Sequence, residues 1–89
     1  MTRNEVYKLV DSERDYQDKR WGKTLSSGRP GDGGRTIDEF ALYILGYSNN
    51  LMYLASHSCD SDSKLDFVRK VAALCVACME QHGGRPREV

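Results

Sequence analysis

The stretch IDEFALYILGYSNNLMYLAS, residues 37–56, decides the fold. Apolar residues recur along it at intervals of three and four, which is the period of an α-helix. Thr36 followed by Glu39 matches the capping box that opens many helices. The pattern predicts a helix over 37–56, with one face formed by Ile37, Phe40, Ala41, Ile44, Ser48, Leu51 and Ala55.

This predicted helix is apolar on nearly every side, since no charged residue lies between Phe40 and Ala55. Such a helix is normally buried on several sides. A chain of 89 residues forms one domain close to the lower size limit for a self-sufficient core. Because so small a domain cannot enclose the helix alone, we expect a homo-oligomer with its subunit interface along 37–56.

A second apolar helix is predicted over 64–82, which reads KLDFVRKVAALCVACMEQH. Ser61, Asp62 or Ser63 could cap its start. Gly83 and Gly84 end it, and 83–89 form a basic tail. The two apolar helices are expected to pair as a long antiparallel hairpin. The main apolar stripe of the second helix consists of Leu65, Val68, Ala72, Cys75 and Met79.

An upstream helix is predicted over 3–20, where Thr2 and Glu5 repeat the capping-box pattern. Its apolar stripe starts at Val6, Leu9 and Val10 and then turns polar, because the next positions on that face are Glu13 and Gln17. Either the helix leaves the core at that point, or these two side chains face a polar cavity.

The chain is therefore expected to be all-α, a single three-helix domain over 1–89. Residues 22–36 read GKTLSSGRPGDGGRT and predict a glycine-rich loop that is long for this domain. Long loops in compact domains are usually functional or disordered.

Charge and cysteine content narrow the function classes. Thirteen basic residues balance thirteen acidic ones, so no net field favours extended nucleic acid or a membrane surface, and no apolar run reaches membrane-spanning length. An odd cysteine count without a hydrophobic signal segment indicates a reducing, cytoplasmic location. Cys75 and Cys78 lie in mid-helix and are expected to pack in the core.

The candidate ligand-binding residues combine aromatic rings with cations. Tyr43 and Tyr47 lie one helical turn apart and could stack a nucleobase, although core or interface packing explains them too. Trp21 is a second candidate for base stacking. Arginine and lysine side chains could hold phosphates, namely Arg20, Lys23, Arg35, Arg69 and Lys70.

A metal site is not predicted. Phosphoryl chemistry with Mg²⁺ needs several converging carboxylates, whereas Asp38, Glu39, Asp66 and Glu80 lie near helix ends and the middle of 37–56 has none. We therefore assign no catalytic residue, no metal ligand and no cofactor. The sequence leaves enzymatic activity open and favours its absence.

The sequence contains ER…Q…RWG over 13–22, EFALYI…Y over 39–47 and RKVAAL…ACMEQHG over 69–83. The order of these three segments resembles small MazG-like, all-α nucleotide pyrophosphohydrolase relatives of bacteriophages and actinobacteria. Catalytic members carry Glu-Glu-x-x-Glu on one helix and Glu-x-x-Asp on a later one, but residues 45–50 here read LGYSNN and 64–82 hold no Glu-x-x-Asp. The resemblance thus implies a helical scaffold for nucleotides without the metal ligands.

Three functions remain open. The first is a non-catalytic, nucleotide-binding homo-oligomer, for example a phage anti-defence protein that sequesters a cyclic nucleotide or an ADP-ribose-type immune signal. The second is an interaction module that binds a host protein through 37–56. The third is a MazG-like pyrophosphohydrolase with a rearranged metal site.

Overall fold

Three helices make up the part of the chain that the structure describes. The computed structural model describes residues 1–21, 35–57 and 60–88, and the side chain of Trp21 lies outside that description. Its helices are α1 (Arg3–Trp21), α2 (Ile37–Ser56) and α3 (Ser61–His82). The described residues contain no strand, which confirms the all-α prediction. Within them, no helix is long and apolar enough to span a membrane.

Local hydrogen bonds explain where α1 and α2 begin. The Thr2 hydroxyl accepts from the Glu5 amide at 3.2 Å, and the Glu5 carboxylate accepts from the Thr2 amide at 3.0 Å. Thr36 and Glu39 make the same reciprocal pair, with both distances 3.0 Å. Both capping boxes are therefore present as the sequence predicted.

The ends of α3 are also set by local chemistry. Asp60 caps its start by accepting from the Ser63 amide at 3.3 Å. α3 therefore begins at Ser61, before the predicted start at residue 64, and the cap is the residue just before those expected. Gly83 ends the helix with φ of +82°, a conformation that glycine adopts without steric cost.

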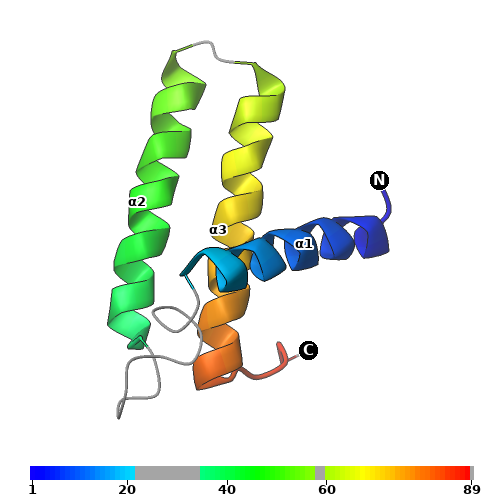
Figure 1. Cartoon of the computed structure of the whole chain (residues 1–89), viewed down its shortest axis with the longest axis vertical. Helices are drawn as coiled ribbons and strands as arrows, with labels where there is room; N and C mark the ends of the chain where they lie inside the picture. Colours follow the sequence, from blue (N-terminus) through cyan, green and yellow to red (C-terminus); the bar gives the residue numbers. More distant parts are fainter. Residues whose placement is uncertain (22–34, 58–59, 89) are drawn as a thin grey trace.

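α3 is the central helix. It lies side by side with α2 and runs in the opposite direction, while α1 lies across α3 (Figure 1). α1 and α2 each pack on α3, and in the part of the chain that is described they do not pack on each other. The domain is thus two helix pairs that share one member.

The hydrophobic core is small. Phe40 of α2 meets Leu74 and Ala77 of α3, and Ile44, Tyr47 and Cys78 pack around them half-buried. The His82 ring meets the Phe40 ring edge-on, with centroids 6.2 Å apart. Among the described residues the buried apolar side chains are Phe40, Ala73, Leu74 and Ala77, few for a domain that must offset its chain entropy by burial.

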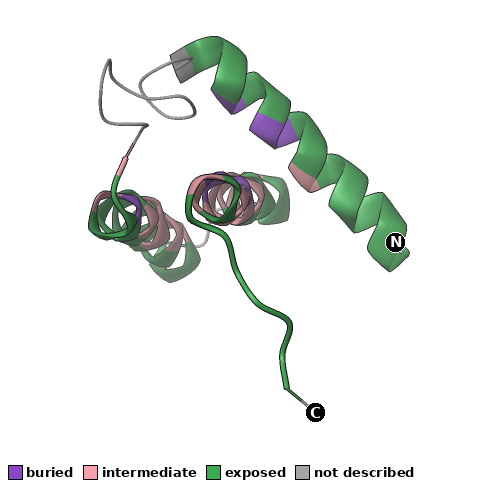
Figure 2. Ribbon diagram, turned by 90° about the horizontal axis from the view of Figure 1, so that it is seen from below, coloured by how far each residue is buried: buried purple, intermediate pink, exposed green. Residues whose placement is uncertain are grey.

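α1 docks through polar side chains, so the first of the two alternatives, that it leaves the core after Val10, is wrong. Glu13, Arg14 and Gln17 are 7%, 4% and 0% exposed, whereas Val6 and Leu9 are over two-fifths exposed. The buried part of α1 is confined to the half nearer its C-terminal end (Figure 2). The apolar start of the stripe projects beyond α3, and the polar continuation makes the contact.

The main apolar stripe of α3 is not its packing face. Leu65, Val68 and Met79 are 60%, 46% and 54% exposed, while Leu74 and Ala77 pack into the core instead. Cys78 packs against the core as expected. Cys75, on the stripe, is half-buried, and burial together with the neighbouring Cys78 raises the pKa of its thiol.

Candidate functional site

An open groove runs along one side of α2. It has a volume of about 260 Å³ and is lined by Leu42, Tyr43, Gly46, Tyr47 and Asn50. Residues three and four apart share a face of a helix, so one α2 surface supplies the whole lining. The groove therefore presents two aromatic rings and one amide, with no charged group among its lining residues.

Arg35 stands at one end of this groove. Its guanidinium carbon lies 5.1 Å from the centre of the Tyr43 ring, within the range of a cation–π contact. The same guanidinium meets the Glu39 carboxylate at 3.2 Å. The Arg35 backbone amide donates to the Gln81 side chain of α3 at 3.0 Å. This hydrogen bond holds the residue that precedes α2 against the C-terminal end of α3.

Phe67 and Lys70 extend the aromatic surface onto α3. The Phe67 ring lies 6.2 Å from the Tyr47 ring, centre to centre. The Lys70 ammonium sits 4.7 Å from the centre of the Phe67 ring. A cation–aromatic run therefore crosses from α2 to α3, and it consists of Arg35, Tyr43, Tyr47, Phe67 and Lys70.

The run joins four of the eight predicted ligand residues and adds one that the sequence analysis missed. Phe67 lies three residues before Lys70, a spacing that places both on one side of a helix. That spacing could have identified Phe67, but its contact with Tyr47 depends on how α2 and α3 align.

Arg69 does not belong to this run. Its guanidinium donates to Glu13 of α1 at 2.6 Å and to Asp66 at 2.8 Å. The hydrogen bond to Glu13 is the main reason why the pKa of Arg69 is raised. Arg69 thus holds α1 to α3. Arg20 is exposed near the end of α1, and Lys23 and the Trp21 side chain lie outside the described residues.

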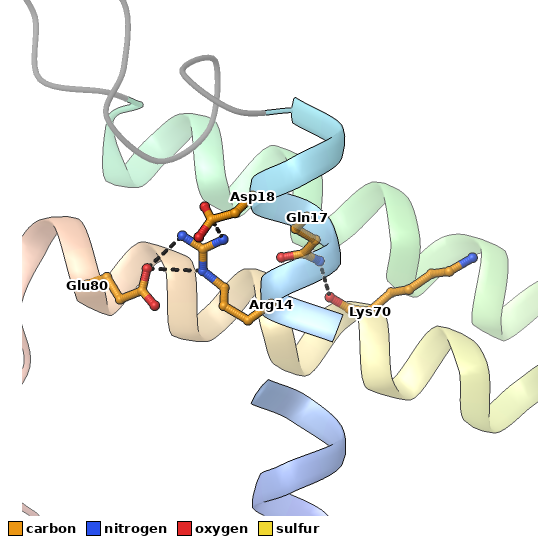
Figure 3. Close-up of polar contacts among 5 residues, drawn as sticks. All are labelled: Arg14, Gln17, Asp18, Lys70 and Glu80. Carbon is orange, nitrogen blue, oxygen red and sulfur yellow. Dashed lines mark hydrogen bonds and ion pairs between the residues drawn. The ribbon is translucent and has the colours of Figure 1, made fainter. Parts of the chain in front are cut away.

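A second polar cluster fastens α1 to α3 beside Arg69. The Arg14 guanidinium donates to Glu80 at 2.6 and 3.0 Å and to Asp18 at 2.8 Å (Figure 3). Burial alone would lower the pKa of Arg14, but the hydrogen bonds to Glu80 and Asp18 raise it overall. Arg14 is therefore a charged residue of α1 that holds this helix on α3.

Gln17 completes the contact between α1 and α3. Its amide nitrogen donates to the Lys70 backbone carbonyl at 3.3 Å, while the Lys70 side chain extends away from Gln17 (Figure 3). The side-chain oxygen of Gln17 is buried and has no hydrogen-bond partner among the described residues. The candidate ligand residue Lys70 is thus held in place by α1 through its backbone.

The carboxylates are distributed as partners of arginine. Glu13, Glu39, Asp66 and Glu80 each pair with an arginine at 3.2 Å or less. In the described ranges, no group of three or more His, Cys, Asp or Glu side chains is placed to hold a metal ion. Glu13 and Glu80 join α1 to α3, whereas Glu39 and Asp66 pair with arginines three or four residues away.

No protein-family model, curated protein or solved structure matches this chain.

Proposed function

We propose that this protein binds a nucleotide-derived small molecule along the cation–aromatic run and does not hydrolyse it. The observation that carries the proposal is the run itself, three aromatic rings flanked by Arg35 and Lys70. A nucleobase stacks on aromatic side chains, and lysine or arginine side chains hold phosphate oxygens. A ligand with one ring and one or more phosphates matches both features.

The charges along the run give the two cations different roles. Arg35 is already neutralised in part by Glu39 at 3.2 Å. Lys70 has no ion pair with a carboxylate among the described residues. Lys70 is therefore the main phosphate contact in this proposal, and Arg35 positions the Tyr43 ring.

The volume of the groove limits the size of the ligand that it can bind. Enclosed ligand sites usually measure about 300–1,000 Å³, and this groove of about 260 Å³ lies just below that range. In this proposal one base lies in the groove, and the sugar and phosphates lie at its rim. A larger signal, such as a cyclic oligonucleotide, would need a second surface.

The distribution of acids supports binding without turnover. Metal-assisted hydrolysis needs several carboxylates that converge on one metal ion. Four carboxylates instead form ion pairs with arginines, namely Glu13, Glu39, Asp66 and Glu80. The resemblance to MazG-like nucleotide enzymes supports a nucleotide ligand on a scaffold without their acids. Sequestration of a cyclic nucleotide or ADP-ribose-type immune signal by a phage protein is the role we propose for such binding.

Native mass spectrometry with a panel of mononucleotides, cyclic nucleotides and ADP-ribose derivatives tests the proposal. We expect a stoichiometric complex with unchanged ligand mass, weakened at least tenfold by Tyr43→Ala and by Lys70→Ala. Tyr16→Ala and Lys19→Ala, on exposed positions of α1, are the matched controls. Absence of any complex refutes the proposal, as does equal weakening by the controls. Release of pyrophosphate would instead support a hydrolase.

A second candidate function, protein interaction through α2, is favoured by one observation. Leu42, Leu45, Met52 and Tyr53 are 56–69% exposed, and large exposed apolar patches mark interaction sites. If a different protein is the partner, α2 stays accessible in the purified protein. A cysteine placed at Leu42 would then react with a maleimide as fast as one placed at Tyr7 of α1. Strong protection would contradict this function.

A further inference from the structure

α3 has three faces, and only two of them are covered. Successive residues of a helix are rotated by about 100°, so Phe67, Leu74 and Cys78 share the side that meets α2. Arg69 and Glu80 lie about two-fifths of a turn away and meet α1. Seen along its axis, α3 has α2 on one flank and α1 on another (Figure 2). The third face carries the apolar stripe.

The stripe has the spacing of a helix–helix seam. Leu65, Val68, Ala72, Cys75 and Met79 follow one another at steps of three, four, three and four residues. This is the a and d pattern by which one helix packs lengthwise against another. In the described protomer the large side chains of the stripe are 46–60% exposed, so the seam lacks its second helix.

α2 widens this bare surface. Ile37, Leu45 and Met52 are 57%, 56% and 63% exposed. Going around the axis of α2, these three residues are rotated in one direction from the residues that face the core. The stripe of α3 is rotated in the same direction from the core-facing residues of α3. Because α2 and α3 run antiparallel, the same sense of rotation leads to the same side of the pair. The cation–aromatic run is rotated the other way and lies on the opposite side.

We propose that this bare surface binds the same surface of a second copy of the chain, with α3 against α3 across a two-fold axis near Ala72. In a two-fold interface the same surface of both subunits is in contact, so that surface must be self-complementary. The stripe carries no charge, and neither does α2 from Phe40 to Ser56. Two copies therefore meet without opposing like charges.

The size order along the stripe also fits an antiparallel crossing at Ala72. The small alanine lies at the centre, where two helix backbones approach most closely, and Leu65 and Met79 lie seven residues to either side. Across the axis, Leu65 faces Met79 of the partner subunit. The contact supplies the burial that a protomer with so small a core lacks. It places α2 at the flank of the interface and stands independently of the ligand proposal.

Sedimentation equilibrium of the full chain tests the proposal. We expect twice the mass of one chain, or an even multiple of it, and at least tenfold weaker association for Val68→Glu. Leu42→Glu is the matched control, because Leu42 is 69% exposed and lies on α2 away from the bare surface. A wild-type chain that is monomeric at every concentration overturns the proposal. So does an oligomer that Leu42→Glu dissociates and Val68→Glu does not.

A cysteine cross-link tests the axis itself, even if Val68→Glu fails to fold. Ala72→Cys is made in a chain whose Cys59, Cys75 and Cys78 are replaced by alanine. A disulfide needs Cα atoms closer than about 7 Å, so mild oxidation should link two copies at residue 72. Asn49→Cys, exposed on α2, should stay unlinked in the same background. Equal linking of both variants, or none at residue 72, overturns the placement near Ala72.

Discussion

Replacing Gln17 by methionine should stabilise this protein. Gln17 is fully buried, and its side-chain oxygen has no partner among the described residues. An unpaired buried acceptor costs about 1–3 kcal/mol. The hydrogen bond that would be lost, to the Lys70 carbonyl at 3.3 Å, is long for its type and contributes about 0.5–1.5 kcal/mol. The balance is a gain of about 1 kcal/mol.

Thermal and urea unfolding, followed by circular dichroism at fixed protein concentration, measure this gain. For a domain of this size, about 1 kcal/mol raises Tm by about 4–8 °C. Methionine is the suitable replacement because it is unbranched, similar in length to glutamine and adaptable in shape. Gln17→Ala is the control, and it should lower stability since it leaves a cavity between α1 and α3.

A loss of 1 kcal/mol or more in the methionine variant would refute the reasoning. It would mean that the Gln17 amide makes stronger hydrogen bonds than the 3.3 Å bond to the Lys70 carbonyl. The same variant also separates packing from binding. Stabilisation combined with lost ligand affinity would make Gln17 a positioning residue for Lys70.

Further predictions concern the ion pairs and the helix caps. Glu80→Gln removes the charge opposite buried Arg14 and should cost about 1–2 kcal/mol after allowance for the half-exposed carboxylate; urea unfolding measures it, and an equal loss in 1 M NaCl would contradict an electrostatic origin. Thr36→Ala should cost about 1 kcal/mol in the same assay, whereas Thr36→Ser, which keeps the hydroxyl, should cost much less. Hydrogen bonds from Ser63 lower the pKa of Asp60, so its stabilising contribution is complete above the unfolded pKa and is lost as pH falls through the lower, folded pKa. Helicity at 222 nm titrated in acid should show this loss, and Asp60→Asn should reduce it.

The sequence was informative about α2 because the signals at its ends are local. Thr36 and Glu39 bond to each other across three residues, and chain neighbours suffice to make that contact. The predicted start of α3 at residue 64 is too late, because Asp60 caps the helix and Ser61 begins it. Serine and aspartate alternate over 60–63, and several of these residues are good caps.

What each helix face meets was not predictable in the same way. Periodicity shows that Leu65, Val68 and Met79 share a face, but it does not show which neighbour that face meets. A buried Glu13 needs a cationic partner, and that partner, Arg69, lies 56 residues away in the chain. Ion pairs between residues far apart in the chain decide the position of α1, and no local sequence pattern predicts them.

The candidate site was predicted in part for the same reason. Tyr43 and Tyr47 lie one turn apart on one helix, so their shared surface follows from α2 alone. Phe67 reaches Tyr47 only because the two helices align as they do. Arg69 and Lys70 are adjacent in sequence and point to different sides, which sends one to α1 and the other to the aromatic rings.

The way α1 is attached also sets an order of assembly. α2 and α3 are joined by a short connection, whereas the bonds that hold α1 span 53 to 66 residues. Loop closure delays contacts of long sequence separation, so we expect α1 to dock after α2 and α3 have paired. In the folded protein we also expect it to be the first helix to detach. Its backbone amides should therefore exchange with solvent through their own local opening, at a lower free energy than the amides around Leu74.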